Sequence, residues 1–144
     1  MDDLRIWVEK GTPDGHSIQY KDAADEFINV RPGAINIKVV VLDHDRFERK
    51  GNDLKIRVNL TLKEALLGFK KDLVHLDKHV VELDRTDKVT KPGLMERFKG
   101  EGMPVFEQYS EVGDLLVTYI VELPEKLSDE QKAYFKEFFE DGSL

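Results

Sequence analysis

The chain has 144 residues, with 22 Lys and Arg against 29 Asp and Glu, so its formal net charge is −7, and it contains no cysteine. The acidic balance argues against nucleic acid and anionic membrane surfaces as partners, because both are bound through basic patches. The absence of cysteine excludes disulfides, thiolate metal sites and a cysteine nucleophile within this sequence, and no apolar run approaches the ~20 residues of a membrane-spanning helix.

The first half of the chain carries three segments in which apolar and polar residues alternate, as is typical of half-buried β-strands. They cover residues 4–8, 35–41 and 54–60. The sequences between them contain Gly, Pro, Asn and Asp, the residues that favour tight turns. Three strands joined by turns or loops are therefore predicted.

A short helix is predicted next, over residues 62–67, with Thr61 as its N-cap and Gly68 at its end. Two further strands follow at residues 80–83 and 115–123, again next to glycine-containing turns. Short strands at regular spacing indicate a mostly antiparallel, sandwich-like architecture. The predicted fold class is mainly β.

The last predicted element is a helix that runs from residue 129 to about residue 140. Ser128 and Gln131 form a capping-box pattern at its start. Four aromatic residues give it a wide apolar face: Tyr134, Phe135, Phe138 and Phe139. This face could pack on its own domain or insert into a groove on a second copy of the chain. We favour the second interpretation, because the helix is terminal and follows a linker at residues 123–126.

The chain also contains an internal similarity. One unit has a strand, a turn ending at Gly15, a loop, and a second strand after Gly33; the other repeats this order with Gly93 and Gly113. About 27 residues precede the unit in the second copy, and none precede it in the first. This pattern predicts a tandem repeat whose first member is truncated, so we expect the chain to be a fragment.

Two histidine clusters are candidates for chemistry. His75 and His79 have a spacing that can share a metal on a helix, but the flanking valines predict a strand–turn–strand hairpin, and no Glu follows His75 as in metalloproteases. Asp43-His44-Asp45 could form an acid–base pair or a buttressed metal ligand, but it ends a strand in a charged loop. We therefore predict no catalytic residue, metal site or cofactor.

Taken together, these motifs resemble the C-terminal region of the DnaJ co-chaperones. The resemblance rests on His44-x-x-Phe47-x-Arg49-x-Gly51-x-Asp53-Leu54, Leu62-x-Glu64-Ala65-Leu66-x-Gly68-Phe69, His75-Leu76-Asp77, Lys91-Pro92-Gly93, Gly100-Glu101-Gly102-Met103-Pro104, Gly113-Asp114-Leu115 and Leu123-Pro124. It extends over nearly the whole chain. The region from Glu64 to Glu107 is most similar to the endoplasmic-reticulum members, which favours the lumen of that compartment over the cytoplasm.

The resemblance implies two tandem β-sandwich-like subdomains that bind unfolded polypeptide clients, followed by a dimerising helix. Residues 1–48 would be the latter half of the first subdomain, residues 49–124 the second, and residues 125–144 the helix. The family's client groove maps onto Leu4 and Ile37, and the dimer contacts onto the four helix aromatics. Residues of this alternating type also commonly belong to an ordinary core.

The resemblance further implies a homodimer that passes clients to a heat-shock ATPase chaperone. That partner is engaged through a J domain, whose His-Pro-Asp signature is absent from this sequence. The first subdomain departs from the family pattern, with Gly33-Ala34-Ile35 in place of Gly-Asp-Leu. Two other functions stay open from the sequence: a monomeric β-sandwich adaptor for a peptide or glycan, and a metal-dependent enzyme that uses His44, His75 and His79.

Overall fold

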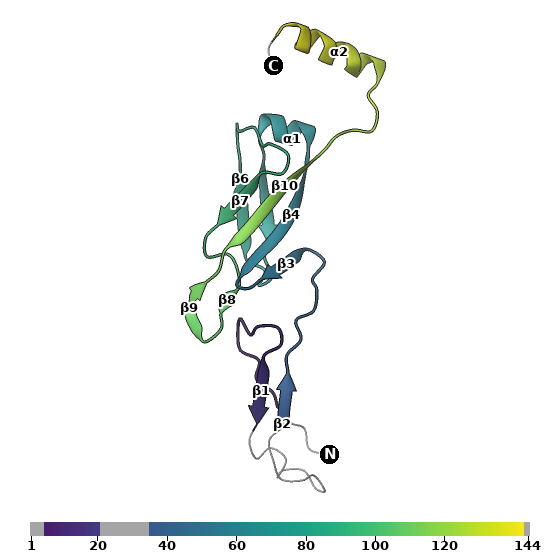
Figure 1. Cartoon of the computed structure of the whole chain (residues 1–144). Coiled ribbons are helices and arrows are strands. Elements are labelled where there is room, and N and C mark those ends of the chain that lie inside the picture. Colours follow the sequence, from purple (N-terminus) through teal and green to yellow (C-terminus); the bar gives the residue numbers. More distant parts are fainter. Residues whose placement is uncertain (1–4, 21–34, 143–144) are drawn as a thin grey trace. The chain divides into compact units, whose positions relative to one another are not determined.

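The computed structural model describes residues 5–20 and 35–142, and within these ranges most of the regular structure is β-strand (Figure 1). The described strands are β1 (Ser17–Tyr20), β2 (Ile35–Lys38), β3 (Phe47–Lys50), β4 (Asp53–Thr61), β5 (Lys70–Val74), β6 (Val80–Asp84), β7 (Met95–Phe98), β8 (Pro104–Val105), β9 (Gln108–Val112) and β10 (Leu115–Glu122). The helices are α1 (Leu62–Leu67) and α2 (Asp129–Glu140). The prediction of a mainly β fold is confirmed. Neither helix has the length and apolar composition needed to cross a membrane.

The chain forms two compact units, and strands β4 and β10 contribute residues to both. The first unit consists of Met1–Val58 with Leu94–Thr118, and the second of Asn59–Gly93 with Tyr119–Leu144. The subdomain boundaries that the resemblance implies, after residues 48 and 124, stay predictions.

The four-stranded sheet has the order β3-β4-β10-β7. Along β4, Leu54 and Ile56 are buried while Arg57 is exposed, which is the period of two that the sequence predicted. Strand β10 is different, because its consecutive residues Leu115, Leu116 and Val117 are all buried. A strand whose side chains are covered on both faces reads as a continuous apolar run rather than as an alternation.

In the first unit, the segment that contains Gly11 and Thr12 is attached to the sheet strand β3. The Arg49 guanidinium donates hydrogen bonds to the carbonyl oxygens of Gly11 (2.8 Å) and Thr12 (2.9 Å). Its Nε also donates to the Gly51 carbonyl, at 2.8 Å. One arginine thus satisfies three main-chain acceptors and fixes the start of the β1–β2 hairpin relative to β3.

In the second unit, helix α1 begins at the predicted cap. The Thr61 side chain accepts a hydrogen bond from the Glu64 amide, and the Glu64 side chain accepts one from the Thr61 amide, so both halves of a capping box form. The core of this unit includes Phe69 and Tyr119, whose rings meet edge to face at 5.4 Å. The β5–β6 hairpin contributes buried Leu73, Val81 and Leu83 to the same unit.

Two strand predictions are wrong in detail. Residues 5–9 form no strand, and all of them are exposed, with 80% of Trp7 accessible. Alternation predicts a strand only where one face becomes buried, and neither face is buried here. The strand predicted over residues 35–41 ends at Lys38, and residues 39–41 continue as irregular chain.

The carboxylate of Asp114 joins the start of β10 to the β7 region. It accepts a hydrogen bond from Arg97 at 2.6 Å and another from the Gly100 amide at 3.2 Å. These interactions, that of Arg97 first, hold the pKa of Asp114 below its ordinary value. The stability that they add is present above the unfolded-state pKa of ~3.9 and is lost as the pH falls through the folded-state pKa.

We therefore expect Asp114→Asn to lower the urea midpoint at pH 7 and to have a smaller effect at pH 3. Below the unfolded-state pKa, the unfolded wild-type chain binds a proton that folding must release, so part of the stabilisation that the variant lacks is already lost at pH 3. Urea titrations of the two proteins at both pH values measure the difference. A midpoint gap that stays constant from pH 7 to pH 3 would contradict the role assigned to this carboxylate.

Candidate functional site

Helix α2 forms for the local reasons that its sequence predicts. The Ser128 side chain accepts a hydrogen bond from the Gln131 amide at 3.2 Å, and the Gln131 side chain accepts one from the Ser128 amide at 2.9 Å. Asp129 and Glu130 lie in the first turn, where the helix dipole favours negative charge. The predicted capping box and helix limits are confirmed.

Among the residues that the structure describes, none covers the aromatic face of α2, and no residue of this helix is buried. Phe135, Phe138 and Phe139 are 38%, 48% and 53% exposed, and Tyr134 is 67% exposed. The Phe135 and Phe139 rings stack at 6.2 Å, and the Phe138 ring meets Phe139 edge to face at 5.7 Å. Leu127 and Lys132 help to line a shallow groove beside Phe135 and Phe139.

Ile37, the predicted client-binding residue, lies in the β1–β2 hairpin of the first unit. It pairs with Ile18 across the hairpin, and Tyr20 pairs with Ile35 in the same antiparallel register. All four residues are half-buried and alternate with exposed neighbours, so they share one apolar face. Leu4, the other predicted client-binding residue, lies outside the described residues.

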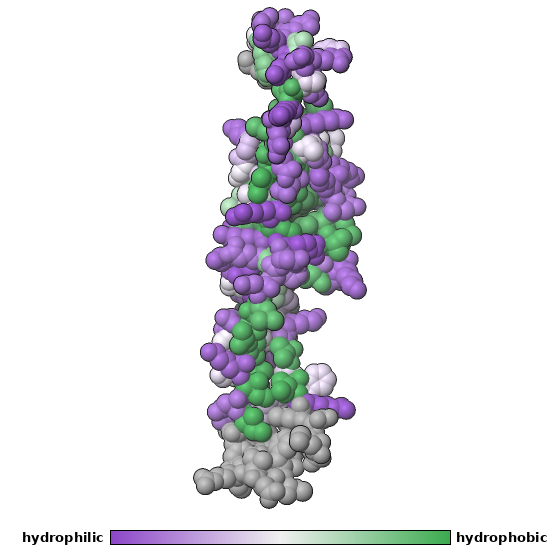
Figure 2. All heavy atoms as spheres, turned by 90° about the vertical axis from the view of Figure 1, so that its right-hand side faces the viewer, coloured by the Kyte–Doolittle hydropathy of each residue, from purple (hydrophilic) through white to green (hydrophobic). Residues whose placement is uncertain are grey.

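Figure 2 shows apolar side chains at the surface of the segment that carries this hairpin. Val40, Leu42 and Val8 of the first unit are also exposed, at 64%, 83% and 62%. Exposed apolar residues at a short two-stranded sheet are suited to holding another extended chain, because main-chain groups and side-chain contacts are offered together.

His44 has a local structural role in the first unit. Its Nδ1 accepts hydrogen bonds from the amides of Arg46 (3.0 Å) and Phe47 (3.3 Å), so this nitrogen carries the lone pair. The imidazole also packs edge to face on Phe47 at 5.6 Å. Asp45 Oδ1 lies 3.1 Å from the same nitrogen. The ring therefore closes the turn that leads into β3.

His75 and His79 lie at the two sides of the β5–β6 turn, as the predicted strand–turn–strand hairpin requires. Val74 and Val80 form the last strand pair before the turn. A hairpin does not require the two rings to converge, yet they stack at 4.7 Å with an angle of 17° between their planes.

Comparison with known proteins identifies the family. Residues 1–124 match the family described as the DnaJ C terminal domain. The chain belongs to this family. It is 42% identical over 142 residues to "DnaJ homolog dnj-20" of Caenorhabditis elegans and 41% identical over 135 residues to "DnaJ protein ERDJ3B" of Oryza sativa subsp. japonica. It is also 35% identical over 142 residues to "DnaJ homolog subfamily B member 11" of Homo sapiens.

These alignments cover 98%, 94% and 98% of the chain, in that order, but only 40%, 38% and 39% of the relatives. The chain thus spans about two fifths of the length of the DnaJ proteins that it matches. The resemblance predicted from the motifs is confirmed, and the chain is a chaperone-associated C-terminal domain.

In this DnaJ C-terminal domain, sequence reasoning missed strand β1, which pairs Ile18 with Ile37 and Tyr20 with Ile35. The internal similarity places Ile18 and Tyr20 in the loop between Gly15 and Gly33. The signal was the pattern Ser17-Ile18-Gln19-Tyr20, which is too short to identify a strand until its partner β2 is known.

Proposed function

We propose that this chain dimerises through α2 and holds unfolded polypeptide for transfer to a heat-shock ATPase chaperone. The observation that carries the proposal is the exposed aromatic face of α2. It occurs in a chain that belongs to the DnaJ C-terminal domain family. The role is one of binding and presentation, without catalysis by this chain. The lumen of the endoplasmic reticulum is the proposed compartment, because the motifs are most similar to its members.

Dimerisation would cover the α2 face. The aromatic side chains of α2 are 38–67% exposed in the single chain. Their entry into an apolar groove would stabilise the complex by ~25 cal/mol per Å² of apolar surface removed from water. The occupant that we propose is the second subdomain of another copy, with each copy donating its helix to the other. Such exchange buries two identical faces in one closed, two-fold arrangement.

Client binding would use the β1–β2 hairpin. The apolar face formed by Ile18, Tyr20, Ile35 and Ile37 accepts side chains of an extended segment, while a strand edge supplies main-chain hydrogen bonds. Because main-chain pairing is independent of sequence, this mode suits clients that share only exposed apolar segments. Transfer to the ATPase chaperone would require the J domain of a longer protein.

The decisive experiment is a comparison of solution masses by light scattering. We expect the full chain to have a mass near 2 × 16.6 = 33.2 kDa at tens of micromolar, and a version that ends at Pro124 to be a monomer, because it lacks α2. Far-UV circular dichroism of the truncated chain checks that its β structure is retained. A monomer in both cases would contradict the dimer and favour a monomeric adaptor.

A further inference from the structure

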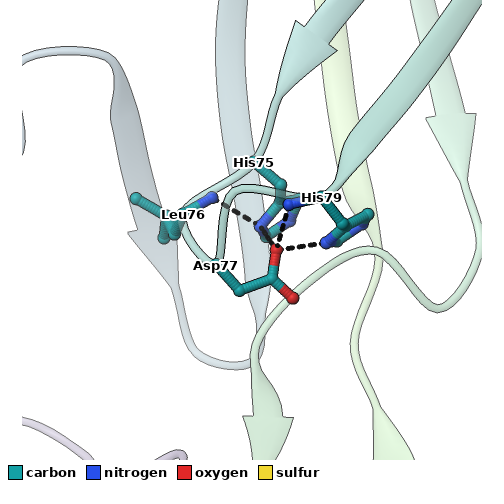
Figure 3. Close-up of polar contacts among 4 residues, drawn as sticks. All are labelled: His75, Leu76, Asp77 and His79. Atoms are coloured by element: carbon teal, nitrogen blue, oxygen red, sulfur yellow. Dashed lines mark hydrogen bonds and ion pairs between the residues drawn. The ribbon is translucent and has the colours of Figure 1, made fainter.

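The turn between β5 and β6 brings two imidazoles and one carboxylate together in the second unit (Figure 3). The His75 amide donates to the His79 carbonyl at 2.8 Å, and the Lys78 amide donates to the His75 carbonyl at 2.9 Å. Lys78 takes a left-handed backbone conformation, with φ of 73°, to close this tight turn. As a result, the rings of His75 and His79 stack with Asp77 beside them.

The potential ligand atoms of these three residues all lie within 4.8 Å of one another. His75 Nδ1 accepts a hydrogen bond from the Leu76 amide at 2.8 Å, so it carries a lone pair. Asp77 Oδ1 lies 4.0 Å from His75 Nδ1 and contacts His79 Nδ1. The His79 amide also donates a hydrogen bond to Asp77 Oδ1, at 3.0 Å.

We propose that His75, Asp77 and His79 form a binding site for a divalent transition-metal ion of the zinc type. Two imidazole nitrogens and one carboxylate oxygen are a donor set that zinc accepts, with water in the fourth position. Ligand atoms around tetrahedral zinc, at ~2.0–2.2 Å from the ion, are about 3.3 Å apart. The exposed side chains of Asp77 and His79 would have to rotate to bring their ligand atoms to this separation from His75 Nδ1.

The three proposed ligands differ in how exposed their side chains are. The side chain of His75 is only 8% exposed, so the fold holds it as a fixed anchor. The side chains of Asp77 and His79 are 69% and 42% exposed, so they can move and the ion can reach them from solvent. Binding would replace the hydrogen bond that His75 receives from Leu76 by a bond to the metal. The Lys78 ammonium, within the same turn, opposes a cation and should keep the affinity moderate.

The test is a calorimetric titration of the untagged, chelator-treated chain with zinc chloride. We expect one equivalent to bind per chain, and His79→Ala to weaken this binding at least about tenfold, because it removes a ligand. His44→Ala is the matched control, since the side chain of His44 is 41% exposed and also lies beside an aspartate, Asp45. His44→Ala should bind zinc like the wild type.

A second readout separates loss of the site from loss of the fold. Zinc that binds the folded chain raises the unfolding midpoint by mass action, so the wild type and His44→Ala should be stabilised while His79→Ala should not. Circular dichroism without metal should be the same for all three proteins. Zinc binding that is absent from the wild type, or equal in His79→Ala and His44→Ala, would overturn the proposal.

Discussion

Replacing Gly113 by alanine should destabilise the first unit by about 3 kcal/mol or more, because the added methyl group has no space. A Cβ at this position would lie 1.9 Å from the Asn52 carbonyl oxygen and 2.5 Å from its carbon. Both are main-chain atoms, so the clash cannot be relieved by rotating a side chain. The Asn52 carbonyl also accepts a hydrogen bond from the Met103 amide at 2.8 Å.

The surrounding hydrogen bonds show why the backbone cannot simply move apart. The Gly113 amide donates to the Met103 carbonyl at 2.9 Å, and the Gly113 carbonyl accepts from the Gly102 amide at 2.8 Å. Moving Gly113 away from Asn52 would strain these hydrogen bonds at the same time, and each broken bond costs about 1 kcal/mol. The segment that leads into β10 is therefore expected to lose its place beside Asn52.

Urea unfolding measures this effect, with Gly100→Ala as the control. Gly100 belongs to the same unit and has φ of 76°, but a Cβ there meets nothing within 4 Å. Its substitution should cost only about 1–2 kcal/mol, for the left-handed conformation. Equal losses in the two variants would show that the close approach to Asn52 carries no particular cost.

Local sequence signals predicted those elements whose ends are determined by their own residues. Both helices begin at the predicted caps, Thr61 and Ser128, because a capping box is complete within four consecutive residues. Strand β4 was predicted for a similar reason, since its alternation runs over nine residues. These features require no knowledge of the rest of the chain.

Elements that depend on a distant partner were not predictable in the same way. Strand β1 has only four residues, and its pairing with β2 crosses the loop that joins them. Residues 5–8 show the opposite error, because a clear alternation exists there without a buried face. Short strands are stabilised mainly by their neighbours, and a single sequence does not identify those neighbours.

The His75–His79 turn contains one feature that the sequence predicts, the hairpin, and one that it does not, the stacking of the two rings. The hairpin itself followed from the valines on either side of it, and the pairing of Val74 with Val80 agrees with that prediction. The stacking of the rings depends on the backbone conformation of Lys78, a residue that seldom adopts positive φ. The sequence therefore predicted the hairpin but not the cluster of potential ligands.

Replacing both Phe135 and Phe138 by alanine should raise the dimer dissociation constant by about a thousandfold or more. Central aromatic residues of an interface typically contribute about 2 kcal/mol each. A two-fold dimer contains each substitution twice, so four side chains are shortened. Even half of the additive sum is about 4 kcal/mol, and about 4.1 kcal/mol corresponds to a thousandfold change. Alanine favours helix, so α2 itself should persist.

Light scattering over a range of concentrations measures this change, with Val40→Ala combined with Leu42→Ala as the control. Those residues are also apolar and, at 64% and 83%, more exposed than the two phenylalanines, but they lie outside α2. The control should stay dimeric at concentrations where the helix variant is a monomer. If both variants have the mass of a dimer at these concentrations, the dimer contacts lie in another part of the chain.

Loss of the dimer should also weaken the binding of clients that carry two binding segments. The affinity for clients with one segment should not change. Two linked sites can raise affinity about 10²- to 10⁴-fold without any new contact, because the second binding event becomes intramolecular. Fluorescence anisotropy with labelled one-segment and two-segment peptides of unfolded character measures both affinities. If the Phe135 and Phe138 double variant binds the two-segment peptide as tightly as the wild type does, bivalency is excluded. Strand addition at the β1–β2 hairpin would then have to account for client binding by each chain alone.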